Sequence, residues 1–271
     1  MSRRIHHLNC ASFCPPPARL PGFLPARLVA HCLLVEDDRG LTLVDTGLGR
    51  DDLANPKRLS MPFVVGMGPV LDPAETAVAQ VGALGFEPED VRDIVLTHLD
   101  VDHAGGISDF PHARVHVFAD ELDAARRRRT GREKGRYVPA QWAHGPDWVE
   151  HTADGGETWL GFEAVHGVCE DIFLVPLRGH TRGHVAVGVA RPEGGWFLHC
   201  GDAYFFHAEK ERPSSCPPGL RAFQAMVQMD RAARLTNRER LRSLHAEHGG
   251  EVTLFSAHDE QEYVALASVT V

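Results

Sequence analysis

Residues 97–106 read Thr-His-Leu-Asp-Val-Asp-His-Ala-Gly-Gly and directly follow the apolar run Ile94-Val95-Leu96. The stretch places two histidines and two aspartates within six residues. A strand that ends in such a cluster can aim imidazole and carboxylate groups at one point, and the glycine pair lets the backbone turn back tightly. Core packing does not require this mixture of side chains, whereas ligation of a divalent metal does. The stretch therefore indicates a metal site at the end of a β-strand.

Three further segments repeat this arrangement of a predicted strand followed by ligand-type residues. They are strand 172–177 before Gly179-His180-Thr181-Arg182-Gly183-His184, strand 196–199 before Cys200-Gly201-Asp202, and strand 252–255 before Ser256-Ala257-His258-Asp259. In each segment a histidine or aspartate lies beside small residues just past the strand. We expect the four strand ends to meet at one rim of a sheet and to build one shared site.

The composition is that of an ordinary globular protein, with 271 residues, 43% hydrophobic and 24% charged, and we expect one domain over residues 1–271. A net charge of −9 argues against a nucleic-acid partner. The most apolar early run, 28–35, is short and contains His31, so it is typical of a strand and not of a membrane span. With six cysteines and no secretory signal, we expect reduced thiols and a cytoplasmic location. We also expect a small-molecule substrate, and oligomer formation stays open.

The chain pattern predicts sheets with helices packed outside them. We expect a β-hairpin from 28–35 and 41–44, strands at 159–165 and 185–190, loops at 2–25 and 50–71, a helix from Asp72 to Gly85, a helix opened by the capping box Thr236–Glu239, and an inserted cap over 126–150.

The ordered motifs Thr-His-x-Asp-x-Asp-His-Ala-Gly-Gly, Gly-His-Thr-x-Gly-His, Gly-Asp-Ala and Ser-Ala-His-Asp resemble those of the metallo-β-lactamase-fold hydrolases, and Asp45-Thr46-Gly47 matches the family's early strand-end aspartate. The similarity runs from about Val29 to Asp259. The resemblance implies an α/β (α+β) chain folded as a four-layer αββα sandwich, with a metal site at one edge of its two sheets. Among the branches of this family, the chain looks most like the lactonases that hydrolyse N-acyl homoserine lactones.

The resemblance also implies two divalent metal ions, with zinc expected and iron or manganese as alternatives. The implied ligands are His98, Asp100 and His180 for the first ion, Asp102, His103 and His258 for the second, and Asp202 as the bridge. His184 competes with His180, and we expect it to lie behind the ligands. We expect Asp45 to support the metal loops through hydrogen bonds.

Asp100 stands where the family usually has histidine. Because aspartate is shorter, Asp100 must approach the metal more closely, ligate through water, or not ligate. If it ligates, Asp100, Asp102, Asp202 and a bridging hydroxide carry −4 against +4 from two divalent ions, which predicts a neutral centre. The extra oxygen ligand favours harder metals than zinc.

The expected reaction is hydrolysis of an ester-like bond, with a lactone as the expected substrate. A hydroxide that bridges two metals attacks a carbonyl group that one of them polarises. Asp102 and Asp202 are the expected catalytic carboxylates, and Tyr204 is the candidate to stabilise the developing oxyanion. Lactonase-type relatives place their tyrosine three residues past the bridging aspartate, where this chain has Phe205.

Three other functions are also compatible with the sequence. Asp100 allows an iron-dependent redox enzyme of the same fold. Seven Lys and Arg residues within 126–136 allow a phosphodiesterase or nuclease, although such a run is most often a solvated helix end. A non-catalytic metal- or ligand-binding protein would follow if Asp100 had abolished catalysis.

Overall fold

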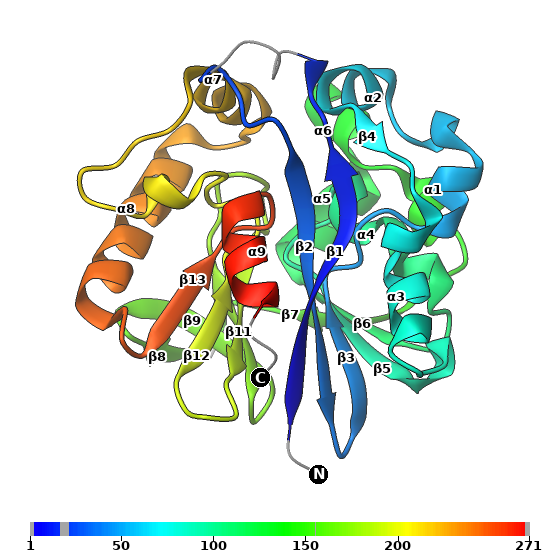
Figure 1. Cartoon of the computed structure of the whole chain (residues 1–271), viewed down its shortest axis with the longest axis horizontal. Helices are drawn as coiled ribbons and strands as arrows, with labels where there is room; N and C mark the ends of the chain where they lie inside the picture. The colour runs from blue at the N-terminus through cyan, green and yellow to red at the C-terminus, as the bar shows by residue number, and fades with distance from the viewer. Residues whose placement is uncertain (1–2, 17–21, 155, 269–271) are drawn as a thin grey trace.

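The computed structural model describes residues 3–16, 22–154 and 156–268, which form two β-sheets packed face to face (Figure 1). The first sheet has the strand order β4 (Pro69–Val70), β1 (Arg4–Phe13), β2 (Leu28–Asp37), β3 (Gly40–Val44), β5 (Val91–Val95), β6 (Arg114–Phe118) and β7 (Asp147–His151). The second has the order β13 (Val252–Phe255), β12 (Trp196–His199), β11 (Val185–Ala190), β10 (Ile172–Pro176), β9 (Phe162–Cys169) and β8 (Glu157–Trp159).

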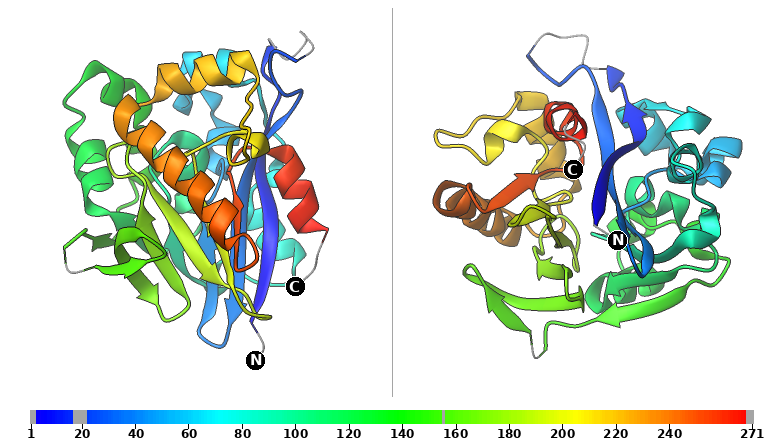
Figure 2. Two further views of the ribbon diagram at one scale, coloured as in Figure 1. Left: turned by 90° about the vertical axis from the view of Figure 1, so that its left-hand side faces the viewer. Right: turned by 60° about the horizontal axis from the view of Figure 1, so that its bottom comes forward.

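Helices cover the outer faces of both sheets (Figure 2). The helices of the described residues are α1 (Arg50–Ala54), α2 (Met61–Met67), α3 (Ala77–Ala83), α4 (Val101–Ala104), α5 (Ala119–Arg127), α6 (Gly131–Arg136), α7 (Pro218–Val227), α8 (Arg231–His248) and α9 (Glu260–Ala267). Helices α3 and α5 pack on the outer face of the first sheet and α8 on that of the second, whereas α9 packs against the core between the sheets. Short 3-10 turns lie at Pro56–Arg58, Pro73–Glu75, Pro88–Asp90, Gly105–Asp109, Pro139–Trp142 and His207–Glu209.

Of the four buried apolar clusters among the described residues, three lie between the layers and the fourth includes α2. The strands feed two clusters at once because strands that are covered on both faces send alternate side chains in opposite directions. In β2, Leu33 and Val35 face the second sheet, whereas Leu34 faces the outer helices α3 and α5. On the other side, α8 packs Leu241 and Leu244 against the outer face of the second sheet. These layers confirm the predicted αββα sandwich.

The topology brings the predicted strand ends to one edge. Strands β3 and β5 run parallel to each other in the first sheet, and β12 and β13 run parallel in the second. Strand β10 runs antiparallel to β11, so the loop from 177 to 184 lies at the end where β11 begins. The loops that follow β3, β5, β10, β12 and β13 therefore meet above the junction of the two sheets.

Several secondary-structure predictions are confirmed, among them the β2–β3 hairpin and the strands at 172–177, 185–190, 196–199 and 252–255. The predicted loop at 2–25 is wrong over Arg4–Phe13, because long-range pairing of β1 with β2 supplies backbone hydrogen bonds that local composition does not reveal. The predicted loop at 50–71 contains α1 and α2, which have five and seven residues and are too short to show periodicity.

Three predicted boundaries also move. Asp72 caps only a 3-10 turn, and α3 begins after Thr76, whose extended backbone separates the two. The capping box at Thr236 is wrong, because Asp230 already caps α8 six residues earlier. The predicted strand 159–165 is broken between β8 and β9, where Leu160 has a left-handed φ of 44°. Of the segment 126–150, the last residues belong to β7 in the first sheet.

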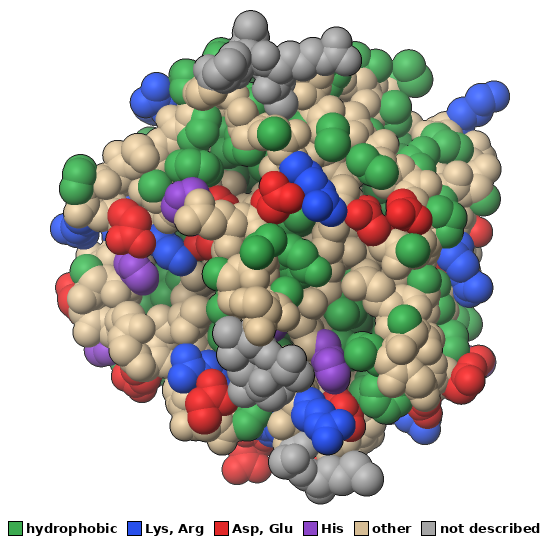
Figure 3. All heavy atoms as spheres, viewed as in Figure 1, with side chains coloured by type: hydrophobic (Ala, Val, Ile, Leu, Met, Phe, Trp, Pro, Cys, Tyr) green, Lys and Arg blue, Asp and Glu red, His purple; other side chains and the backbone are tan. Residues whose placement is uncertain are grey.

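Within the described part of the chain, no helix is long and apolar enough to cross a membrane. The face of the molecule in Figure 3 shows acidic and basic side chains interspersed, without a large area of one sign.

Candidate metal centre

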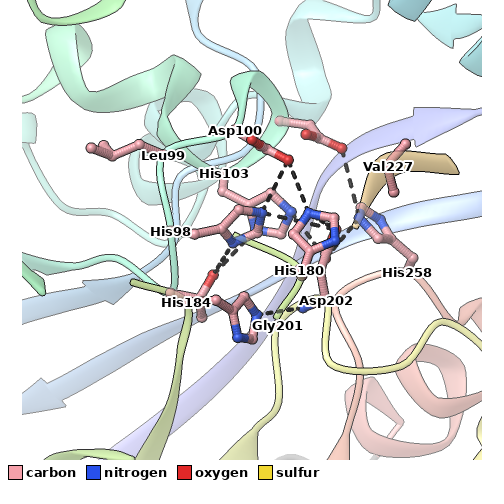
Figure 4. A network of polar contacts seen from close by, with 12 residues as sticks. His98, Leu99, Asp100, His103, His180, His184, Gly201, Asp202, Val227 and His258 are labelled. Atoms are coloured by element: carbon pink, nitrogen blue, oxygen red, sulfur yellow. Dashed lines mark hydrogen bonds and ion pairs between the residues drawn. The ribbon is translucent and has the colours of Figure 1, made fainter. Parts of the chain in front are cut away.

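The first cluster of donors joins side chains that follow three different strands: His98 and Asp100 after β5, His180 after β10 and Asp202 after β12 (Figure 4). Oδ2 of Asp100 lies 3.4 Å from Nε2 of His98 and 3.0 Å from Nε2 of His180. Oδ2 of Asp202 lies 3.9 and 3.2 Å from the same two nitrogens. Neighbouring donors around a tetrahedral metal at about 2.05 Å would lie about 3.3 Å apart, so the spacing suits one ion.

The second cluster consists of Asp102, His103 and His258. Nε2 of His258 lies 3.7 Å from Oδ2 of Asp102. Oδ1 of Asp202 lies 3.3 Å from Nε2 of His103 and 3.1 Å from Nε2 of His258. The two oxygens of Asp202 therefore face different clusters, which is the placement that a bridging carboxylate requires.

Several donor atoms at the centre are buried without a hydrogen-bond partner among the described residues. They are Nε2 of His98, Nε2 of His103, Oδ1 of Asp100 and Oδ1 of Asp202. Unpaired polar atoms in a protein interior are costly, and bound cations would remove that cost. Because imidazole nitrogens and carboxylate oxygens are also the donors that zinc takes, the residues fit a pair of divalent metal ions.

Hydrogen bonds behind the centre fix which ring nitrogen faces it. Nδ1 of His258 donates to the carbonyl oxygen of Val29 at 2.8 Å, and Nδ1 of His103 donates to Oδ2 of Asp45 at 2.8 Å. Nδ1 of His98 lies 2.9 Å from the hydroxyl of Thr97. A histidine that donates through Nδ1 keeps a free lone pair on Nε2, so these contacts orient the rings for metal binding.

Asp45, which follows β3, supports the metal-binding loop after β5. Its carboxylate accepts hydrogen bonds from the Thr97 backbone N–H and hydroxyl, each at 2.8 Å, in addition to the bond from His103. Burial acts to raise the pKa of Asp45, but His103 and its neighbours outweigh it and lower that pKa to about 2. The residue has a left-handed φ of 56°, a conformation that aspartate tolerates better than most residues. The expected supporting role is confirmed by these contacts.

His184 lies behind the ligands, because both of its nitrogens are already used. Nδ1 donates to the carbonyl oxygen of Leu177 at 3.0 Å, and Nε2 accepts the Asp202 backbone N–H at 2.9 Å. His184 therefore positions Asp202, and His180 is the histidine of this loop that joins the cluster.

The glycine pair Gly105-Gly106 is required by close approach and not by a left-handed backbone. A Cβ at Gly105 would lie 2.4 Å from Oδ2 of Asp52, and one at Gly106 would lie 2.8 Å from the carbonyl oxygen of Thr46. The absence of side chains lets the loop after β5 pack directly on the loop after β3.

The structure does not bring Tyr204 to the centre, so its predicted role in oxyanion stabilisation is wrong. The Tyr204 side chain is fully buried in the core beneath α8, and its hydroxyl donates to Glu262 at 3.1 Å. Phe205 faces the site instead and stacks on the His258 ring with centroids 4.8 Å apart.

Arg136 is a residue of the centre that the sequence did not single out. Its Nη1 donates to Oδ2 of Asp100 at 2.6 Å and lies 3.0 Å from Nε2 of His180. Burial acts to raise the pKa of Asp100, but Arg136, His98 and His180 together outweigh it and hold that pKa well below its ordinary value. The expectation of a neutral centre left out this cation, and with Arg136 included the centre carries one more positive charge.

Glu121, in α5, is a second residue near the centre that the sequence did not single out. Its fully buried carboxylate accepts hydrogen bonds from the Leu99 backbone N–H at 3.1 Å, the Gly183 backbone N–H at 2.9 Å and the Tyr137 hydroxyl at 3.0 Å. Glu121 thus ties the loop of His98, the loop of His180 and the segment after α6 together. No local pattern marks either residue, since their partners are distant in the chain.

A cavity of about 310 Å³ opens beside the donors. Asp100, Asp102, His180, Asp202 and His258 line one part of it. The other walls are mainly apolar and come from α2, α7 and the loop after β12, with Phe63, Met67, Phe205, Phe223 and Met226 among the lining residues.

The model of the Metallo-beta-lactamase superfamily matches residues 26–248 of this chain. A "Probable metallo-hydrolase" of Mycobacterium tuberculosis is 40% identical to the chain over 263 residues, which cover 96% of this chain and 81% of that protein. An N-acyl homoserine lactonase of Bacillus thuringiensis is 34% identical over 189 residues, which cover 69% of this chain and 68% of the lactonase.

The fold is also found among solved structures. A crystal structure of a mutant of the B. thuringiensis protein AiiA, with N-decanoyl-L-homoserine bound at its active site, aligns with a TM-score of 0.71. The alignment covers 97% of this chain and 95% of that one at 20% sequence identity, so it supports the fold.

Proposed function

Because this chain belongs to the metallo-beta-lactamase superfamily of metallo-hydrolases, we propose that it hydrolyses lactones that carry an apolar acyl chain. The observation that carries the proposal is the pair of donor clusters joined by Asp202 at the floor of a cavity with apolar walls. The relatives named as N-acyl homoserine lactonases share this reaction class and add support.

We propose that His98, Asp100, His180 and Asp202 hold one divalent ion, and that Asp102, His103, His258 and Asp202 hold the other. Zinc accepts this mixture of nitrogen and oxygen donors, and iron or manganese, which the extra oxygen of Asp100 favours, would be the alternatives. When bound, such ions lower the pKa of water and polarise a carbonyl group. In the overall reaction the ester C–O bond of the lactone ring breaks. Water supplies hydroxyl to the carbonyl carbon of the ring and a proton to the released alkoxide.

The residues of this chain orient the reactants and limit the space around them. Asp202 is held through its backbone by His184, so its two oxygens stay aimed at the two clusters. Asp102 lines the cavity, and as a second catalytic carboxylate it would guide water or the leaving group there. Phe205 and Phe223 pack edge-on, with ring centroids 5.8 Å apart, and present an apolar wall to an acyl chain.

The proposal is tested by assaying zinc-loaded protein on N-acyl lactones of increasing chain length, on aryl esters and on phosphodiesters. We expect turnover of the lactones that chelation abolishes and added zinc restores. Each methylene that enters the apolar cavity should improve binding by roughly 0.8 kcal/mol until the cavity is full. His98→Ala should abolish turnover, whereas His112→Ala, which alters an exposed histidine away from the centre, should not.

Protein that binds two zinc ions per chain but turns over neither lactones nor esters would refute the hydrolase assignment and favour a metal- or ligand-binding role. Turnover of phosphodiesters alone would refute lactone specificity in favour of a phosphodiesterase.

A further inference from the structure

Arg136 is the last residue of α6, and it reaches the metal centre from outside the two sheets. Its side chain is about 10% exposed, and the exposed part faces the cavity. Nη1 contacts both Asp100 and His180, while Nη2 donates to the carbonyl oxygen of Val227 at the end of α7. A buried cation beside two candidate metal ligands is unfavourable unless a nearby negative charge compensates it.

Asp100 supplies that charge. Asp100, Asp102 and Asp202 bring −3 to the centre, and Arg136 returns the total to −2. A neutral histidine at position 100 without Arg136 would give the same −2. The aspartate and the arginine together therefore match one neutral donor in charge, while the oxygen of Asp100 still faces the first cluster.

We propose that Asp100 and Arg136 form one functional unit of the metal centre, in which Asp100 is the donor and Arg136 positions it and cancels its charge. The proposal rests on the metal centre proposed above and not on the identity of the substrate. Arg136 thus belongs to the centre itself, although it lies in a run of basic residues that are otherwise mostly exposed.

The surroundings of Arg136 hold the guanidinium in place. The neighbouring Tyr137 donates its hydroxyl to Glu121, which also binds the backbone beside His98. The Val227 carbonyl fixes the opposite end of the guanidinium. Because these contacts come from α5 and α7, the position of Arg136 is set by the packed fold.

Arg132 provides a matched contrast. It lies one turn earlier on α6 and lines the same cavity, but its guanidinium donates to the Gln228 carbonyl oxygen at 3.0 Å. No contact of Arg132 with the candidate ligands is found among the described residues. Removing Arg132 therefore changes the charge of the cavity without changing Asp100.

The test is a double-mutant cycle on zinc affinity, measured by competition with a chromophoric chelator, on the variants D100H, R136M and D100H/R136M. We expect D100H to weaken zinc binding at least about tenfold, because Arg136 is left uncompensated beside the ion. Adding R136M to D100H should restore the affinity to within about threefold of the wild type. The same R136M change alone should not improve zinc binding, since it leaves Asp100 without its partner.

Two further variants separate charge from packing. R136K keeps the charge and should retain zinc affinity to within about threefold, and R132M should leave it unchanged. If R136M changes zinc affinity by the same factor with and without D100H, the proposed unit does not exist. Because the readout is metal binding, this result stands apart from any failure to hydrolyse lactones.

Discussion

Removing the carboxylate of Glu121 should loosen both metal-binding loops at once. Glu121→Ala deletes the acceptor of three buried donors: the backbone N–H groups of Leu99 and Gly183 and the hydroxyl of Tyr137. Each buried donor left without a partner costs about 1–3 kcal/mol. Burial raises the pKa of Glu121, so part of this cost is offset by no longer burying a carboxylate. We expect a net loss of about 3–5 kcal/mol in the free energy of unfolding.

The same substitution should weaken zinc binding by at least about tenfold, because the freed loops carry His98 and His180. The assay pairs urea unfolding of the metal-free protein with chelator competition for zinc. Asp123→Ala is the control on the same helix, since Asp123 is half exposed and pairs only with neighbouring surface arginines among the described residues. The control should change the unfolding free energy by less than about 0.5 kcal/mol. A Glu121→Ala protein within 1 kcal/mol of wild type, with unchanged zinc affinity, would show that Glu121 is not the link between the loops.

Two further predictions concern Asp45, behind the metal centre, and His7, in β1. Asp45→Asn should lower zinc affinity about 10- to 100-fold, because an amide cannot accept all three hydrogen bonds that orient His103 and Thr97. Zinc affinity is measured by chelator competition, with Asp51→Asn, at an exposed position, as the control. His7 should make the protein less stable in acid. Burial, together with His199 and His6, lowers the pKa of His7 from 6.5 to about 4. The unfolded chain then takes up a proton below about pH 6.5 that the folded protein does not, so stability falls as the pH drops, by about 2 kcal/mol between pH 7 and pH 5. His7→Gln should flatten the pH dependence of urea unfolding over this range, whereas an unchanged slope, equal to that of His112→Gln, would contradict the assignment.

The sequence alone determined the chemistry of the centre and the family. Ligand residues directly after apolar strands are a local signal. Their order along the chain resembles that of the metallo-β-lactamase-fold hydrolases, and this resemblance led to the αββα fold and to the seven candidate donors, whose clustering the structure shows. The supporting role of Asp45 followed in the same way, because it too occupies a strand end.

Only the tertiary structure decided how the charge of the centre is balanced and which side chains hold it. Arg136 meets Asp100 across 36 residues and Val227 across 91, and no periodicity or spacing records such a contact. In the sequence Arg136 is one more cation in a basic run, and Tyr204 is a hydroxyl near Asp202. Packing directs Arg136 toward the metal centre and Tyr204 into the core, because the direction of a side chain depends on which distant elements cover it.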